Sequence, residues 1–169
     1  MDIKSIPNHE LERLKQKSQE LSGSKTDFHT EYSSFLARRL NNEPLQYIEE
    51  FMPFYTVQLR VDERALIPRP ETEYLIEVIK NKVKDPKSIL DVGTGSGCIS
   101  IMLKSLYQNA NVTGIDISPN AIELAKENAI LNNLDVNFIE SDLLENVPEN
   151  NFDLIVANLP YIPTNDIKT

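Results

Sequence analysis

The chain has 169 residues, 40% of them hydrophobic and 25% charged, a balance typical of a soluble globular protein rather than a disordered or membrane-spanning one. Its 26 acidic and 17 basic residues give a formal net charge of −9, which disfavours nucleic acid as a direct partner. One cysteine, Cys98, excludes an internal disulfide, and one cysteine with two histidines disfavours a zinc site, so we expect a cytoplasmic protein without a bound metal.

Two helices are expected in the part of the chain up to Leu40. Apolar residues recur at helical spacing within 11–21 and again within 28–36. Residues 22–24, Ser-Gly-Ser, interrupt the pattern, and Asp27 stands where the N-cap of the second helix would lie.

A strand and a third helix are expected next. Residues 55–61 alternate apolar and polar side chains with a period of two, which indicates a half-buried strand. The prolines in 66–70 prevent this strand from continuing, and Pro70 suits the first turn of a helix. The apolar residues of that helix would be Tyr74, Leu75, Val78 and Ile79.

From Ser88 onward the pattern becomes strand, loop and helix in alternation. Short apolar strands are expected at 89–92, 112–116, 136–139 and 154–157. Ser118 and Pro119 are expected to cap and start the helix after the second of these strands. Such alternation predicts an α/β fold with a parallel, doubly wound sheet, whose strands lie in the order third, second, first, fourth.

The turn after the first of these strands gives the strongest local signal. Glycines at alternate positions, Gly93, Gly95 and Gly97, let the backbone turn sharply and approach a ligand closely. A dinucleotide-binding fingerprint would need another glycine at Cys98, whereas this spacing after an acidic residue resembles the first motif of Rossmann-like S-adenosylmethionine methyltransferases. A turn that merely needs glycines is the alternative. The candidate cofactor-binding residues of this segment are Asp91, Gly93, Thr94, Gly95, Ser96 and Gly97.

Two more candidate positions follow later strands. Asp116 comes 23 residues after Gly93, at the end of the second strand, where a carboxylate can accept hydrogen bonds from both ribose hydroxyls. It could instead cap a helix, but Ser118 is the better cap, which would leave Asp116 free for a ligand. Asp142 and Leu143 follow the third strand, where a carboxylate and a backbone N–H could meet adenine, and a helix cap is an equal alternative there.

The segment 158–161, Asn-Leu-Pro-Tyr, follows the fourth strand and is the candidate chemical centre. A planar amide or amino nitrogen is a poor nucleophile because its lone pair is delocalised, so an enzyme would hold both its N–H groups with two acceptors. The Asn158 side-chain oxygen and the Leu159 backbone carbonyl can supply these acceptors. Pro160 restricts Leu159 to extended conformations, and Tyr161 can stack on the amide plane. A strand end with an ordinary proline turn is the alternative, although ligands bind beyond the carboxyl ends of strands in such sheets.

Four segments taken together resemble the HemK/PrmC family, the N5-glutamine methyltransferases of release factors. These segments are 42–48, 66–73, 91–97 and 158–161, and the second matches the most distinctive stretch of the family almost residue for residue. The resemblance implies a helical substrate-recognition domain over 1–41, a β-hairpin linker over 42–70 and the N-terminal part of a Rossmann-like methyltransferase domain over 71–169.

The resemblance also implies an activity. It is the S-adenosyl-L-methionine-dependent methylation of the side-chain amide nitrogen N5 of a glutamine in peptide chain release factors, without direct nucleic-acid or membrane contact. Orientation would supply most of the catalysis, roughly 7–11 kcal/mol in favourable cases. Three alternatives stay open: a ribosomal-protein glutamine methyltransferase, an adenine-N6 DNA methyltransferase, and an inactive cofactor-binding fragment. The DNA enzyme would need base flipping and a basic face, and it would leave residues 68–73 unexplained.

The chain departs from the family pattern at three points. Leu159 replaces the first proline of the family's Asn-Pro-Pro-Tyr motif, and Thr56 stands where the family often has glycine. The chain also ends at Thr169, shortly after the fourth strand, so we expect a fragment or a truncated gene product. Strand 154–157 would then lie at the edge of the sheet, and we expect residues 1–169 to be marginally stable and to associate through it.

Overall fold

The structure, a computed structural model, describes residues 3–22, 27–148 and 151–159. The chain divides into two compact units, Met1–Met52 and Pro53–Thr169, called here the N-terminal and C-terminal units. The three-part division expected from the family resemblance, with boundaries near residues 41 and 70, stays a prediction.

The N-terminal unit is helical. Its elements are a short 3-10 helix at Ile3–Ser5, α1 (Asn8–Leu21), α2 (Phe28–Leu40) and α3 (Leu45–Glu49). Leu14, Phe35, Leu45 and Ile48 form its buried core, so all three α-helices contribute to one apolar cluster. Asp27 is the N-cap residue of α2, as predicted, although its side chain makes no capping hydrogen bond.

A two-stranded sheet of β1 (Phe51–Phe54) and β2 (Val57–Arg60) follows. The strand predicted over 55–61 therefore starts two residues later than expected. Tyr55 has a φ of 52°, a left-handed conformation that a strand does not allow and that marks the turn of the hairpin. The Tyr55 backbone N–H donates to Glu73 Oε1 at 3.0 Å, which fixes this turn against the helix that comes after it.

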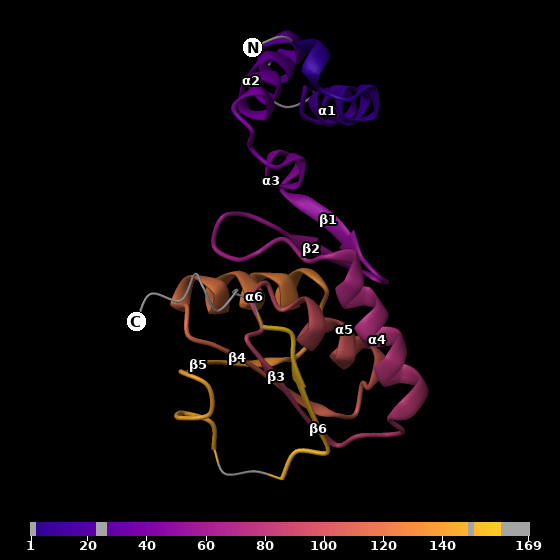
Figure 1. Cartoon of the computed structure of the whole chain (residues 1–169), viewed down its shortest axis with the longest axis vertical. Coiled ribbons are helices and arrows are strands. Elements are labelled where there is room, and N and C mark those ends of the chain that lie inside the picture. The colour runs from indigo at the N-terminus through magenta and orange to yellow at the C-terminus, as the bar shows by residue number, and fades with distance from the viewer. Residues whose placement is uncertain (1–2, 23–26, 149–150, 160–169) are drawn as a thin grey trace, which may run out of the picture. The chain divides into compact units, whose positions relative to one another are not determined.

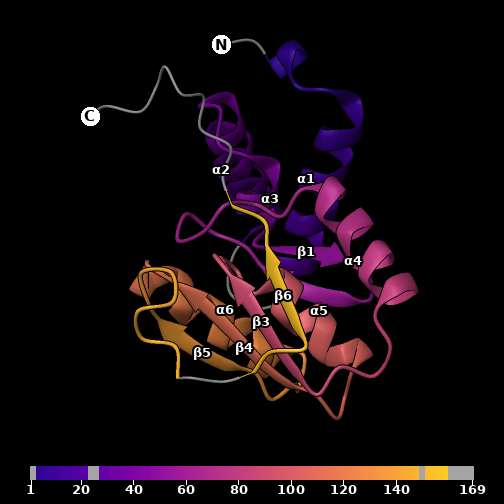
Figure 2. The same cartoon turned by 60° about the horizontal axis from the view of Figure 1, so that its bottom comes forward.

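The main sheet of the C-terminal unit is parallel and has the predicted strand order. Its strands are β3 (Ser88–Val92), β4 (Asn111–Asp116), β5 (Asn137–Glu140) and β6 (Leu154–Ala157), arranged as β5-β4-β3-β6. Every neighbouring pair is parallel, so the carboxyl ends of all four strands lie at one edge of the sheet (Figures 1 and 2). This edge is where a doubly wound sheet binds ligands.

Three helices complete the C-terminal unit: α4 (Pro70–Lys82), α5 (Cys98–Leu106) and α6 (Pro119–Leu131). Helices α5 and α6 pack on the sheet and α4 packs against α5 (Figure 1). Pro70 lies in the first turn of α4, and the Ser118 hydroxyl accepts from the Ala121 N–H at 3.3 Å to cap α6, both as predicted. None of the helices within the described residues is long and apolar enough to cross a membrane.

Helix α5 packs closely on the sheet at Gly114 of β4. A Cβ added to Gly114 of β4 would come within 2.7 Å of Ser100 Oγ on α5 and 2.8 Å of the Phe138 ring on β5. Glycine at this position therefore lets α5 approach the strands. The residues of α5 from Cys98 to Leu103 are all buried.

Candidate functional site

The glycine-rich turn joins the carboxyl end of β3 to α5. Its three glycines all have positive φ, 71° at Gly93, 56° at Gly95 and 81° at Gly97, a region that other residues rarely occupy. Gly97 is also the N-cap of α5, and a Cβ there would lie 3.1 Å from Cβ of Ala125 on α6. The three glycines thus allow the turn, and Gly97 also allows the close packing of α5 against α6.

A buried hydrogen-bond cluster lies beneath this turn. Oδ2 of Asp91 accepts from the hydroxyls of Thr94 and Ser100, each at 2.7 Å, and from the Ser100 N–H at 3.2 Å. Asp91 is fully buried and does not line the cavity described below. Burial raises the pKa of its carboxyl, and the hydrogen bonds from Ser100 and Thr94 oppose that rise. Asp91 therefore fixes the turn from below, and its predicted contact with a cofactor stays a prediction.

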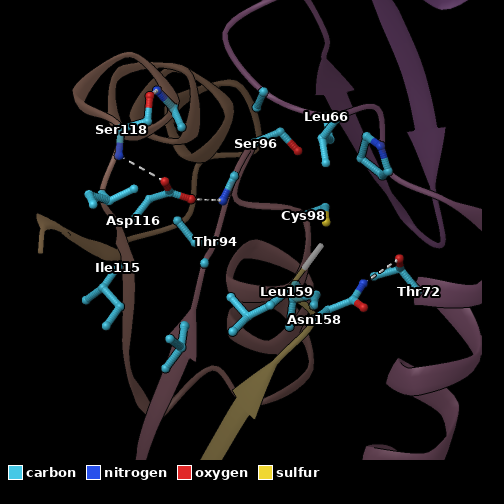
Figure 3. A pocket seen from close by; sticks show the side chains of 18 of the residues that line it. Leu66, Thr72, Thr94, Ser96, Cys98, Ile115, Asp116, Ser118, Asn158 and Leu159 are labelled. Carbon is cyan, nitrogen blue, oxygen red and sulfur yellow. Dashed lines mark hydrogen bonds between the residues drawn. The ribbon is translucent and has the colours of Figure 1, made fainter. Parts of the chain in front are cut away.

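Asp116, at the end of β4, is bonded to the turn rather than free. Its Oδ2 accepts from the Gly95 N–H at 2.9 Å and its Oδ1 accepts from the Ser118 N–H at 3.0 Å (Figure 3). The expectation that Ser118 capping would leave Asp116 unengaged is wrong, because the carboxylate binds backbone N–H groups on both sides. Each carboxylate oxygen has a further lone-pair position, so the group can still accept from a ligand.

Asp142 and Leu143 lie after β5 and line the same cavity as Asp116. Leu143 has a φ of 47°, and the Ser141 hydroxyl donates to the Leu143 carbonyl at 2.8 Å. The same hydroxyl oxygen accepts from the Asn146 N–H at 3.0 Å. Ser141 thus holds a tight turn that presents Asp142 and Leu143 at the cavity wall.

Asn158 and Leu159 directly follow β6. Asn158 Nδ2 donates to the Thr72 hydroxyl of α4 at 3.0 Å, and both residues line the cavity (Figure 3). The Leu159 side chain lies over the glycine turn, since a Cβ on Gly93 would come within 2.5 Å of Leu159 Cδ2. The remaining predicted catalytic residues, Pro160 and Tyr161, lie outside the described residues.

These groups surround one cavity of about 470 Å³. Figure 3 shows Asp116 on one side of it and the pair Thr72–Asn158 on the other. The carboxyl ends of all four strands reach it, through Val92, Ile115, Ser141 and Asn158. Of the predicted site residues, cofactor-binding and catalytic, the lining includes Gly93, Thr94, Gly95, Ser96, Asp116, Asp142, Leu143, Asn158 and Leu159.

One wall of the cavity was not assigned from the sequence. It is the segment 64–69 with Thr72, which overlaps the stretch 66–73 that carries the family resemblance. Arg64 anchors this wall, because its guanidinium donates to Asp62 and to Glu127 of α6 at 2.8 Å. These hydrogen bonds lower the pKa of both carboxyls. A proline-rich stretch before a helix was the available sequence signal, but it does not show which residues would face a ligand.

Cys98 and Ser96, two polar residues near the glycine turn, differ in what their side chains can do. Cys98 is buried, and burial raises the pKa of its thiol to about 12, so it is a small core residue at a helix start and not a nucleophile. Ser96 is 3% exposed and lines the cavity, yet its hydroxyl has no hydrogen-bond partner within the described part of the chain. A buried hydroxyl in that state fits a polar ligand at this position.

Two asparagines, Asn128 of α6 and Asn132 just after the end of α6, attach the hairpin to this site. Asn128 Oδ1 accepts from the Arg60 N–H at 2.7 Å and its Nδ2 donates to the Arg60 carbonyl at 3.0 Å. Asn132, one turn further, makes the same pair of bonds with Gln58, at 3.1 and 2.7 Å. Asn128 Nδ2 also donates to the Ser96 carbonyl at 2.9 Å, which links β2 to the glycine turn. The two amides thus bond to the backbone of β2 as a neighbouring strand would.

Comparison with protein-family models identifies the family to which most of the C-terminal unit belongs. A family model described as the methyltransferase small domain matches residues 70–169. The chain belongs to this family. The match begins at Pro70, the first residue of α4, and it includes every strand of the main sheet and the glycine turn.

Curated relatives from several bacteria match a wider part of the chain than the methyltransferase small domain does. The release factor glutamine methyltransferase of Lactococcus lactis subsp. lactis is 47% identical over 139 residues, covering 81% of this chain and 51% of that protein. The protein of the same name from Deinococcus radiodurans is 43% identical over 136 residues, covering 79% and 49%. The chain thus spans about half the length of the curated relatives it matches.

Solved structures confirm the predicted Rossmann-like methyltransferase fold. The tRNA (uracil-54, C5)-methyltransferase of Pyrococcus abyssi, solved with S-adenosyl-L-homocysteine, is 26% identical with a TM-score of 0.55, covering 66% of this chain and 28% of that chain. A tRNA methyltransferase of M. jannaschii is 31% identical with a TM-score of 0.54, covering 66% and 35%. Within the described residues there is no cluster of three or more His, Cys, Asp or Glu side chains able to hold a metal.

Proposed function

We propose that the cavity binds S-adenosyl-L-methionine. The observation that carries this proposal is the convergence of Asp116, the glycine turn and Ser96 on one cavity at the carboxyl ends of parallel strands. The unpartnered Ser96 hydroxyl and the free lone pairs of Asp116 fit the polar groups of a nucleoside with an amino-acid tail. The related P. abyssi enzyme was solved with S-adenosyl-L-homocysteine, the demethylated form of this cofactor.

The reaction we propose is methyl transfer to the N5 amide nitrogen of a glutamine side chain. The cofactor would supply an electrophilic methyl group on a sulfonium sulfur. Asn158 Oδ1 and the Leu159 carbonyl would accept the two amide N–H groups and so aim the nitrogen lone pair at the methyl group. Pro160 would hold Leu159 extended and Tyr161 would stack on the amide plane. The nitrogen would lose a proton after methylation, when it has become acidic, so no strong base is required.

The substrate we propose is a peptide chain release factor. Support comes from eight curated relatives at 41–47% identity, each of which is named a release factor glutamine methyltransferase. The helical N-terminal unit would take part in recognising this protein substrate. We place the protein in the cytoplasm, where translation termination occurs and where Cys98 would stay reduced.

Calorimetric titration and a methylation assay test the two parts of the proposal separately. Residues 1–169 are titrated with S-adenosyl-L-homocysteine, and methylation of a release factor glutamine is followed by mass spectrometry with S-adenosyl-L-methionine present. We expect Asn158→Ala to abolish methylation while cofactor affinity stays close to that of the wild type, because Asn158 is assigned to the substrate amide. Asn109→Ala, an exposed loop substitution away from the cavity, serves as the matched control.

Each outcome of these measurements has a distinct meaning. Absence of cofactor binding would refute the whole proposal. Binding without methylation of the release factor would refute the substrate assignment for this chain, and methylation of DNA adenine or of a ribosomal protein would replace it. Equal losses of binding and methylation in Asn158→Ala would show that Asn158 has a structural role.

A further inference from the structure

The first turn of α4 contacts the end of β6 through one buried hydroxyl. Thr72 is 4% exposed, and its Oγ1 accepts a hydrogen bond of 3.0 Å from Nδ2 of Asn158, 86 residues further along the chain. Asn158 itself is exposed to the cavity, so the contact joins a buried anchor to a side chain that a ligand can reach. Figure 3 shows this bond at the cavity wall opposite Asp116.

The direction of this hydrogen bond determines what Asn158 can do. A carboxamide has a donor end and an acceptor end, and rotation of its last torsion by half a turn exchanges them. With Nδ2 bonded to Thr72, Oδ1 is the atom left for a ligand, and within the described residues Oδ1 has no hydrogen-bond partner. In the opposite orientation the Thr72 hydroxyl would donate to Oδ1, and the NH₂ group would face the ligand, where it repels another N–H donor.

The rigidity of Thr72 comes from its surroundings. Its backbone N–H donates to the Arg69 carbonyl at 2.9 Å, and Pro70 fixes φ in the first turn of α4. The residue directly after Thr72 is Glu73. Its side chain accepts a hydrogen bond from the Tyr55 N–H, which links the same turn to the hairpin. The backbone of the turn is therefore held on both sides, and the burial of Thr72 leaves its side chain little room to move.

We propose that Thr72 is a positioning residue that holds the Asn158 carboxamide with Oδ1 toward the cavity, so that this oxygen accepts an N–H of the substrate amide. The second half of this statement rests on the proposed function, and the first half does not. Thr72 lies in the stretch 66–73, and no other residue role in the proposed methyl transfer falls within that stretch. The proposal also predicts that the site prefers a ligand that donates a hydrogen bond to Asn158 Oδ1, such as an amide or amino group, over one that only accepts hydrogen bonds.

The test compares Thr72→Val, which keeps the shape but removes the hydroxyl, with Thr72→Ser, which keeps the hydroxyl. Thr113→Val, a half-buried position on β4 outside the cavity lining, controls for the loss of any threonine hydroxyl. In ¹⁵N-labelled protein, the exchange rate and chemical shift of the Asn158 side-chain NH₂ report the hydrogen bond without reference to activity. Methylation of a release factor glutamine then gives kcat and KM, and titration with S-adenosyl-L-homocysteine gives cofactor affinity.

We expect Thr72→Val to speed exchange of the Asn158 NH₂ protons and to lower kcat by about 100-fold, the effect of a misplaced reacting group. Cofactor affinity and melting temperature should stay near those of the wild type, and Thr72→Ser should restore both the NMR signal and kcat to within a few-fold. Thr113→Val should change neither.

Unchanged Asn158 NH₂ signals in Thr72→Val would overturn the proposal whether or not the chain methylates anything. A changed NH₂ signal with unchanged kcat would overturn the positioning role in catalysis. A changed signal in a chain whose wild type transfers no methyl group would support the orientation of Asn158 and count against the proposed function instead. A kcat equally low in Thr72→Ser would show that the side chain's shape matters and its hydroxyl does not, which contradicts the proposal.

Discussion

The carboxylate of Asp116 holds the backbone on both sides of the cavity rim. One oxygen accepts from Gly95 in the glycine turn and the other from Ser118 at the start of α6. These two bonds orient the carboxylate before any ligand arrives, so little rotamer freedom is left to lose on binding. At the residue scale, the candidate site is therefore largely preorganised.

We expect Asp116→Ala to weaken binding of S-adenosyl-L-homocysteine by about 1–3 kcal/mol, because ligand hydroxyls would lose a charged acceptor. That loss corresponds to an increase of about 5- to 150-fold in Kd, which calorimetric titration measures directly. Asp135→Ala, which removes the same charge from an exposed loop position, should leave Kd unchanged. If both variants bind as tightly as the wild type, Asp116 is not a cofactor ligand and serves only the two backbone bonds.

Gly93 has two separate reasons to be glycine. Its φ of 71° is strained for other residues, and an added Cβ would meet Leu159 Cδ2 at 2.5 Å. We expect Gly93→Ala to lower the free energy of unfolding by about 1–2 kcal/mol from the backbone strain and by about 1–3 kcal/mol from the clash. The two contributions can be separated in a double mutant.

Urea unfolding of Gly93→Ala, Leu159→Ala and the double mutant measures this. Removing the Leu159 side chain should abolish the clash and leave only the backbone cost, so that Gly93→Ala is less destabilising in the Leu159→Ala background. An identical cost in both backgrounds would mean that the Leu159 side chain moves away freely and that strain alone excludes alanine.

At the residue scale, some features of the site could be predicted from the sequence and others could not. The glycines were predictable because positive φ leaves few other choices, and Ser118 was predictable because its cap is local. The engagement of Asp116 by Gly95 and the bond from Asn158 to Thr72 were not, since each joins residues 21 or 86 positions apart and leaves no periodic signal.

At the scale of elements, α6 organises three other parts of the C-terminal unit. It packs on β4 and β5, its Glu127 bonds Arg64 on the cavity wall, and its asparagines bond the hairpin strand β2. Asn128 is fully buried, whereas Asn132 is partly exposed. The same amide geometry thus occurs in two environments, one within α6 and one at its C-cap.

We expect Asn128→Ala to lower the free energy of unfolding by about 2–4 kcal/mol, because it leaves the Arg60 N–H and the carbonyls of Arg60 and Ser96 without their partner. Asn132→Ala should cost about 1 kcal/mol or less, because water can replace its bonds to Gln58. Urea unfolding of both variants checks the difference. Equal costs would show that burial does not govern these two interactions.

Strand prediction worked best where the apolar run was continuous. Strand β6 has the predicted bounds, 154–157, because Leu-Ile-Val-Ala has neither turn residues nor polar breaks. The hairpin strand was predicted too long because the alternation begins at Tyr55, and nothing in the alternation reveals that Tyr55 adopts a left-handed turn conformation. The role of Asn128 was also hidden, since asparagine in a helix ordinarily indicates only a solvent-facing or terminal position.

At the scale of the whole molecule, charge and the edge of the main sheet act in opposite directions. A net charge of −9 keeps separate copies apart at low ionic strength. Within the described residues β6 pairs only with β3, so its other edge presents unpaired backbone groups, and Ile155 on this strand is 58% exposed. An exposed apolar edge strand is a template for pairing with another copy.

We therefore expect residues 1–169 to associate through β6 as concentration and salt rise, because added salt screens the repulsion but leaves apolar contact intact. Ile155→Lys should suppress this association, since charged lysines on edge strands are one of the means by which proteins prevent edge-to-edge pairing. Ile130→Lys on α6 is the matched control. It makes the same change of charge at a side chain that is even more exposed, 76%, but it lies on a helix, which has no unpaired strand edge.

Light scattering coupled to size-exclusion chromatography measures the mass of each variant across salt concentrations. Ile155→Lys alone should stay monomeric, while Ile130→Lys should follow the wild type. A wild type that stays monomeric throughout, or equal suppression by both lysines, would show that the β6 edge does not drive association.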